Sequence, residues 1–170
     1  MRRNFKMIRG GVLFLSCMAI PLIISAWLLY SYTTRISIPH TVKLADCTNN
    51  MTAFHVMIPK GHAYHLELKV PEIQVMTDGT VTSSYKFSGR VRILNGENLV
   101  ADFPIDSDKA WLTSSCFVIT GVDFQNTNLP PLNQFVQAQK NYDIQITLDP
   151  PPTSSSIWLY WLQSKLDMSK

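Results

Sequence analysis

Three histidines and a glutamate gather in a short stretch of the chain, at His55, His62, His65 and Glu67. His55 and His65 stand in two segments of alternating apolar and polar residues separated by turn residues. This pattern predicts an antiparallel hairpin with both histidines and Glu67 on its polar face. Two imidazoles and a carboxylate can bind zinc, but such sites need tighter spacing or a second cluster. We therefore interpret these residues as a solvated sheet face and expect no metal and no other cofactor.

Other residue types that support catalysis occur without the spacing that catalysis requires. The chain has no Gly-x-Ser-x-Gly turn of the kind that exposes a nucleophilic serine. Asp102, Asp106 and Asp108 are close in sequence, but they lack the central glycine and final glutamate of a calcium-binding loop. We interpret them as solvent-facing acids. The sequence therefore predicts a protein that is not an enzyme.

One segment near the C-terminus, residues 156–163, is apolar on both faces if it forms a strand. One face then carries Ile157, Leu159 and Trp161, and the other carries Trp158, Tyr160 and Leu162. A central strand buried on both sides is one interpretation. A strand whose second face is covered by a loop is another. We test the prediction that the segment is the last strand of the sandwich and packs chiefly through Ile157, Leu159 and Trp161. Trp158 and Tyr160 are then the candidate partner surface, because aromatic side chains supply contact area at low entropic cost.

The first 32 residues indicate on which side of a membrane the rest of the chain lies. Residues 11–32 contain no charge, and as a helix they would extend ~33 Å, enough to cross a bilayer core of ~30 Å. The preceding residues carry Arg2, Arg3, Lys6 and Arg9 and no acid, which places the N-terminus in the cytoplasm. A signal peptide cleaved after Ala26 is the alternative, but the apolar segment continues past that point.

This pattern predicts four parts: a basic cytoplasmic tail (1–10), a transmembrane signal anchor (11–32), a linker (33–39) and an extracytoplasmic domain (40–170). We expect a single-pass protein of the cytoplasmic (inner) membrane with its domain in the periplasm. Four of the 15 basic residues precede Gly11 and all 12 acidic residues follow Tyr32, so the domain itself is nearly neutral. No basic stripe interleaved with aromatic residues is present, which excludes nucleic acid as the expected partner.

Two cysteines, Cys47 and Cys116, lie outside the anchor. In an oxidising compartment an even number of cysteines usually pairs, so we predict a disulfide between them. Two separate buried thiols are the alternative.

After the anchor the chain reads as about seven or eight short strands separated by turn signals, with no long helical period. Asn95-Gly96 is a strong hairpin signal between two such strands. Residues 142–148 alternate without interruption, and residues 156–163 form the last strand. The predicted fold is an all-β, immunoglobulin-like antiparallel sandwich, preceded by one transmembrane helix.

Residues 136–144 form a loop that ends in Tyr142, where an alternating strand begins. This arrangement is similar to the tyrosine corner of immunoglobulin-like and fibronectin type III sandwiches, which implies a hydroxyl bonded back to the preceding loop. The layout as a whole resembles small membrane-anchored β-sandwich proteins of bacterial envelopes. We expect a protein-interaction module of the cell envelope, either an accessory subunit or an immunity-type protein that captures a toxin. A glycan- or lipid-binding module that uses exposed tryptophan and tyrosine side chains is the alternative, with Trp111, Trp158 or Trp161 as its candidate residues.

Overall fold

The computed structural model describes residues 20–30, 37–121 and 128–164. Residues 20–30 form a helix whose side chains include no charge. No helix within these described ranges is long and apolar enough to cross a membrane. Residues 11–19 and 31–32 of the predicted anchor lie outside them, so the described helix does not by itself support the predicted span.

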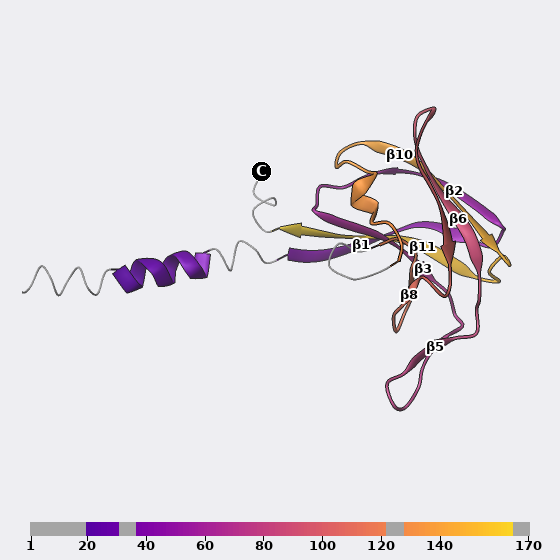
Figure 1. Cartoon of the computed structure of the whole chain (residues 1–170), viewed down its shortest axis with the longest axis horizontal. Helices are drawn as coiled ribbons and strands as arrows, with labels where there is room; N and C mark the ends of the chain where they lie inside the picture. The colour runs from indigo at the N-terminus through magenta and orange to yellow at the C-terminus, as the bar shows by residue number, and fades with distance from the viewer. Residues whose placement is uncertain (1–19, 31–36, 122–127, 165–170) are drawn as a thin grey trace, which may run out of the picture. The chain divides into compact units, whose positions relative to one another are not determined.

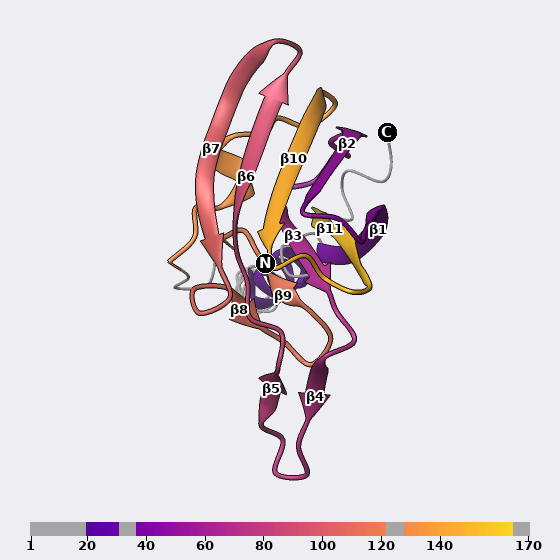
Figure 2. The ribbon, with the colours of Figure 1, turned by 90° about the vertical axis from the view of Figure 1, so that its right-hand side faces the viewer.

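Residues 38–163 form a separate compact unit built from two antiparallel sheets (Figures 1 and 2). The five-stranded sheet has the order β1 (Ser37–Cys47), β11 (Ser155–Ser164), β3 (Ala63–Lys69), β9 (Phe117–Val118), β8 (Trp111–Leu112). The four-stranded sheet has the order β2 (Met51–Met57), β10 (Asn141–Asp149), β6 (Ser88–Asn95), β7 (Asn98–Asp106). The short strands β4 (Ile73–Val75) and β5 (Val81–Ser83) form a hairpin that projects from the sandwich in Figure 2. The prediction of an all-β sandwich is confirmed.

The pairing of the strands is nested along the chain. β1 neighbours β11, β2 neighbours β10, β3 neighbours β9, and β6 forms a hairpin with β7. This is the rolled-up double hairpin of a jelly roll, with two Greek keys and alternate crossing between two sheets. An immunoglobulin-like sandwich instead keeps its first two strands side by side in one sheet. The predicted immunoglobulin-like topology is therefore wrong in this respect, although the two-layer architecture is right.

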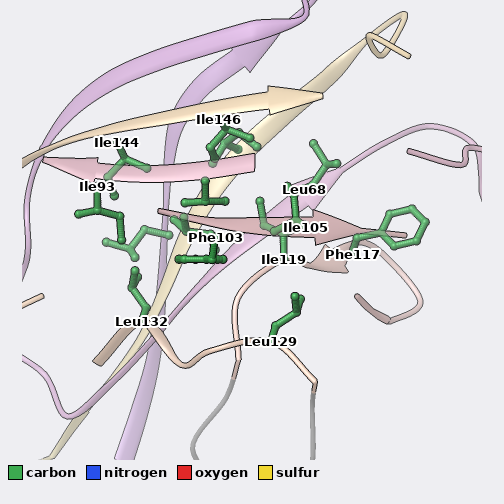
Figure 3. Packing of buried hydrophobic residues seen from close by; sticks show 14 of the residues in the cluster. Leu68, Ile93, Phe103, Ile105, Phe117, Ile119, Leu129, Leu132, Ile144 and Ile146 are labelled. Carbon is green, nitrogen blue, oxygen red and sulfur yellow. The ribbon is translucent and has the colours of Figure 1, made fainter. Parts of the chain in front are cut away.

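The core lies between the two sheets and is filled from strands with period-two alternation. Every second residue of β10 is buried: Tyr142, Ile144, Ile146 and Leu148. In Figure 3, Ile93 and Ile144 of the four-stranded sheet lie in the same cluster as Leu68 and Phe117 of the five-stranded sheet. The burial of these apolar side chains between the two sheets is the main contribution to the stability of the fold.

Two hairpin predictions have opposite outcomes. The Asn95-Gly96 hairpin is confirmed: β6 and β7 are joined by Gly96 and Glu97, and Gly96 adopts φ +61°, the left-handed region that such tight turns require. The hairpin that would bring His55 beside His65 is wrong. β2 pairs with β10 in one sheet and β3 pairs with β11 in the other, because the chain crosses between the layers at this turn.

Two loops at one end of the sandwich share the tyrosine arrangement. The Tyr142 hydroxyl accepts the backbone N–H of Gln137 at 3.0 Å, five residues upstream. The Tyr64 hydroxyl donates to the carbonyl of Pro59 at 2.8 Å, again five residues upstream. The predicted tyrosine-corner contact is therefore present, and it occurs twice. Each tyrosine fixes the loop that leads into its own strand.

The predicted disulfide between Cys47 and Cys116 is wrong, because both are buried free thiols. Cys47 ends β1 and belongs to the main core, whereas Cys116 precedes β9 and clusters with Val118 away from that core. β11 and β3 lie between the two strands. Three strand spacings amount to about 14 Å, twice the Cα separation of about 7 Å that a disulfide tolerates.

Candidate interaction site

The outward side chains of the five-stranded sheet form a surface that we call the aromatic face, defined by Trp111, Trp158 and Tyr160. In β11, Ile157 and Leu159 are fully buried in the core. Because side chains alternate along a strand, Trp158 and Tyr160 point to the opposite side. The predicted orientation of this strand is therefore confirmed, and its role as a partner surface stays a prediction.

Strand register decides which residues meet on this face. Trp158 of β11 is opposite Glu67 of β3, Glu67 is opposite Val118 of β9, and Val118 is opposite Trp111 of β8. Tyr160 is opposite His65 in the adjoining row. The two tryptophans therefore lie on either side of a central carboxylate.

That carboxylate is held by a buried histidine. The Nε2 atom of His65 lies 3.2 Å from Oε1 of Glu67, and the two side chains are only 8% and 12% exposed. The imidazole stacks on the ring of Tyr160, with 4.4 Å between centroids. Burial opposes ionisation of Glu67, but the hydrogen bond and charge of His65, with the charge of Lys69, outweigh it and lower the pKa of the carboxyl group. Glu67 is thus a largely buried carboxylate that is held in its ionised form by a histidine, which itself stacks on a tyrosine ring.

The side of Glu67 toward β11 already carries a cation. The Lys69 ammonium lies 4.1 Å from the ring centroid of Trp158 and 3.9 Å from Oε2 of Glu67. The Trp158 indole N–H donates to Oγ of Ser156 at 2.7 Å, which fixes the plane of that ring. This is a cation–π contact completed by a carboxylate counter-ion.

Glu67 also lines a cavity of about 270 Å³, whose lining residues come from β11, β3, β9, β8 and the segment that joins β8 to β9. Its lining is His65, Glu67, Trp111, Thr113, Ser115, Cys116, Val118 and Tyr160. Trp111 is 40% exposed, so part of its ring is accessible to solvent beside this cavity. The arrangement therefore offers a small recess with aromatic walls and one anionic group.

Cys116 lines the cavity but has the character of a structural thiol. Its Sγ lies 3.1 Å from Oγ1 of Thr113, and its backbone N–H donates to the same oxygen at 3.1 Å. Burial raises the pKa of the thiol, and the nearby negative charge of Glu67 raises it further against the opposing hydrogen bond of Thr113. A neutral thiol is a poor nucleophile, so the cavity is better suited to binding than to covalent chemistry.

The outward surface of the four-stranded sheet differs in kind. Asp102 is bracketed by Arg90 and Arg92, and its contact with the Arg90 Nε atom is the closer of the two. His55 and Asp143 form an ion pair at 2.8 Å with side chains 63% and 51% exposed. This pair lines a second cavity, of about 300 Å³, whose other residues include no tryptophan or tyrosine. Such exposed charges are typical of a solvated face.

The structure shows that the predicted polar face with both histidines does not exist, and it shows what the neighbouring acids Asp106 and Asp108 contact. His55 and His65 lie in different sheets, and the described ranges contain no group of three or more histidine, cysteine or acidic residues placed to bind a metal. Asp106 accepts the backbone N–H of Asp108 through Oδ1, and Asp108 pairs with Lys86 at 2.6 Å. The acids therefore serve local turns and surface pairs.

The sequence pointed to Trp158 and Tyr160 as the partner surface and to Trp111 only as a candidate for glycan or lipid binding, and it did not predict that Cys116 and Glu67 join them at one cavity. Trp158 and Tyr160 belong to one uninterrupted strand, so the sequence showed that they share a face, whereas the burial of Ile157 and Leu159 decides that this face is the outward one. Trp111 and Cys116 stand in a segment with only two-residue strands. A tryptophan outside the long alternating strands was the signal that the sequence offered for Trp111, and only the structure shows that its ring is exposed.

The chain has no match among protein-family models or curated proteins. Among solved structures it is similar to a protein from Sulfurospirillum deleyianum, with 9% identity, 75% of this chain and 98% of that chain covered, and a TM-score of 0.35. It is also similar to the infectious bursal disease virus VP2 subviral particle, with 10% identity, 76% of this chain and 31% of that chain covered, and a TM-score of 0.26. At these scores the likeness carries no argument about function.

Proposed function

We propose that this protein is a non-enzymatic interaction module of the cell envelope, anchored in the inner membrane, whose aromatic face binds an extracytoplasmic protein. The observation that carries the proposal is the half-exposed Trp111 beside a recess on the same face as Trp158 and Tyr160. Aromatic residues grouped around a recess are the usual anchors of protein interfaces.

Membrane anchoring rests on the sequence of the first 32 residues. A helix that is apolar on all sides belongs in a protein core or a membrane, and residues 20–30 form a helix with no charged residue. The basic residues that precede it are Arg2, Arg3, Lys6 and Arg9. In the proposed topology this end is cytoplasmic and the β-sandwich is periplasmic.

A protein partner is favoured by the grouping of aromatic rings on the five-stranded sheet. Trp111, Trp158 and Tyr160 share its outward face with a buried His65–Glu67 pair. The exposed large apolar side chains of the four-stranded sheet are Met51, Met57, Leu99 and Val100, and none of them is aromatic. Aromatic rings grouped on one face are typical of a protein interface. Glycan binding is the second candidate, because a tryptophan beside hydroxyl groups can also stack on a sugar ring.

Site-specific cross-linking tests this proposal in intact cells. A photoreactive amino acid replaces Trp111 in one variant and Leu99, which is 51% exposed on β7, in a matched control. We expect a discrete protein adduct at position 111 that Tyr160→Ala weakens, and none at position 99. Adducts at both positions, or at 99 alone, would refute the aromatic face as the interface.

Protease added to spheroplasts tests the topology. The proposal requires digestion of the domain from outside and retention of the N-terminal segment in the membrane fraction. A protected domain, or a soluble form that begins near Trp27, would show that the anchor is misassigned.

A further inference from the structure

We propose that the cavity beside Trp111 receives a basic side chain of the protein partner, an arginine guanidinium or a lysine ammonium, with Glu67 as its counter-ion and the rings of Trp111 and Tyr160 as its walls. This inference rests on the proposed function and names the chemistry of its contact.

The aromatic face already binds one cation in this manner. Lys69 of the chain itself sits over Trp158 at 4.1 Å and 3.9 Å from Oε2 of Glu67. The row Trp158, Glu67, Val118, Trp111 places a second tryptophan on the other side of the same carboxylate. Trp111 is two strands from Glu67, with Val118 between them, and both residues line the same cavity, so a cation that enters it can meet the ring and the carboxylate.

The carboxylate retains capacity for another donor. Glu67 receives contacts from His65 at 3.2 Å and Lys69 at 3.9 Å, and a side-chain hydrogen bond from Cys116. An ionised carboxylate offers about four lone-pair directions, so one remains. Since Glu67 lines the cavity, a guanidinium or ammonium entering it meets a fixed negative charge in a partly dehydrated setting, where ion pairs are stronger than at the surface.

The size of the cavity fits one side chain. At about 270 Å³ it lies below the range of about 300–1,000 Å³ of sites for drug-sized ligands. A neutral apolar side chain would fill it and leave the carboxylate without a partner on that side, which is unfavourable. A basic side chain can form a cation–π contact with the rings and an ion pair with the Glu67 carboxylate.

The molecule supplies its own control in the His55–Asp143 cavity. That cavity has a similar volume, about 300 Å³, and also contains a histidine–carboxylate pair. Its pair is exposed, and no tryptophan or tyrosine lines it. If a carboxylate beside a histidine were sufficient, both cavities would bind a cation, whereas the proposal requires only the first to do so.

The test titrates the full chain in detergent micelles with two probes, N-acetyl-arginine amide and its uncharged isostere N-acetyl-citrulline amide. Tryptophan is replaced by 5-fluorotryptophan, and the Trp111 fluorine signal is assigned by its loss in Trp111→Phe. We expect a saturable shift of this signal with the arginine probe and a markedly weaker one with citrulline. Glu67→Gln should weaken arginine binding by about tenfold or more, while Asp143→Asn should leave it unchanged.

Several results would overturn the inference. Equal binding of both probes, unchanged binding in Glu67→Gln, or no saturable shift at concentrations on the order of 100 mM each rules out a cation anchored by Glu67. A shift with methyl glucoside and none with arginine would favour the glycan alternative. If Glu67→Gln fails to fold by circular dichroism, Trp111→Leu replaces it, because that half-exposed ring is outside the core. This variant has no Trp111 fluorine signal, so arginine binding is then followed by ligand-observed NMR of the probe in wild type and variant, and the loss of Trp111 must abolish it.

The outcome is separable from that of the proposed function. Failure of the arginine probe with a persistent adduct at position 111 would leave the aromatic face as an interface with another contact chemistry. Loss of the adduct as well would remove the interface itself.

Discussion

Adjacent residues of β11 allow a direct test of which side of the strand supports the fold. Leu159→Ala removes a side chain that is fully buried and lies opposite Leu66, which is also fully buried. Leucine-to-alanine changes cost about 2–5 kcal/mol, and a site enclosed on all sides falls in the upper part, about 3–5 kcal/mol. For a domain of this size that loss lowers Tm by about 10–20 °C.

Trp158→Ala removes a larger side chain from the same strand but from its outward face. The ring is partly exposed, and its main contact is the Lys69 ammonium at 4.1 Å. We expect a loss of about 1 kcal/mol in the free energy of unfolding. The smaller side chain is therefore predicted to matter several times more than the larger one.

Urea unfolding of both full-length variants in detergent, followed by far-ultraviolet circular dichroism, measures the two losses without relying on tryptophan emission. Equal losses would mean that the strand is buried on both sides, and the aromatic face would then not be available to a partner. Two negligible losses would mean that the segment is not part of the core at all.

Three further outcomes are expected. The pKa of Glu67 in the folded chain lies below its ordinary value of 4.5. The stability that its ionised form contributes is therefore present above that value and is lost as the pH falls through the folded pKa. The difference in unfolding free energy between the wild type and Glu67→Gln should shrink on acidification, and a difference that grows would contradict the lowered pKa. Tyr64→Phe removes the 2.8 Å hydrogen bond to Pro59 and should cost about 1–2 kcal/mol in urea unfolding, while no measurable loss would show that the loop is held by other contacts. Cys47 and Cys116 should resist thiol reagents in the native chain and both react in denaturant without reductant, and a linked peptide pair in non-reducing mapping would disprove their separation.

The sequence by itself determined which way side chains point along an unbroken strand. The alternation of residues 142–148 was sufficient to assign inward and outward faces, because a strand has a side-chain period of two regardless of its neighbours. In residues 156–163, where both sets of side chains are apolar, the period indicated which side chains share a face but not which face is buried. The Gly96 hairpin was equally readable, because the requirement for positive φ is local to the turn. The contact between Tyr142 and its loop spans only five residues and was predictable for the same reason.

The tertiary structure alone decided which strand lies beside which. Alternation around His55 and His65 fits a hairpin and a crossing between sheets equally well, so the sequence placed the two histidines together when they lie in different layers. The even cysteine count predicted a pair that the strand order keeps far apart. Glu67, Cys116 and Trp111 come from three strands joined by non-local hydrogen bonds, and their meeting at one cavity depends on register, which no local pattern records.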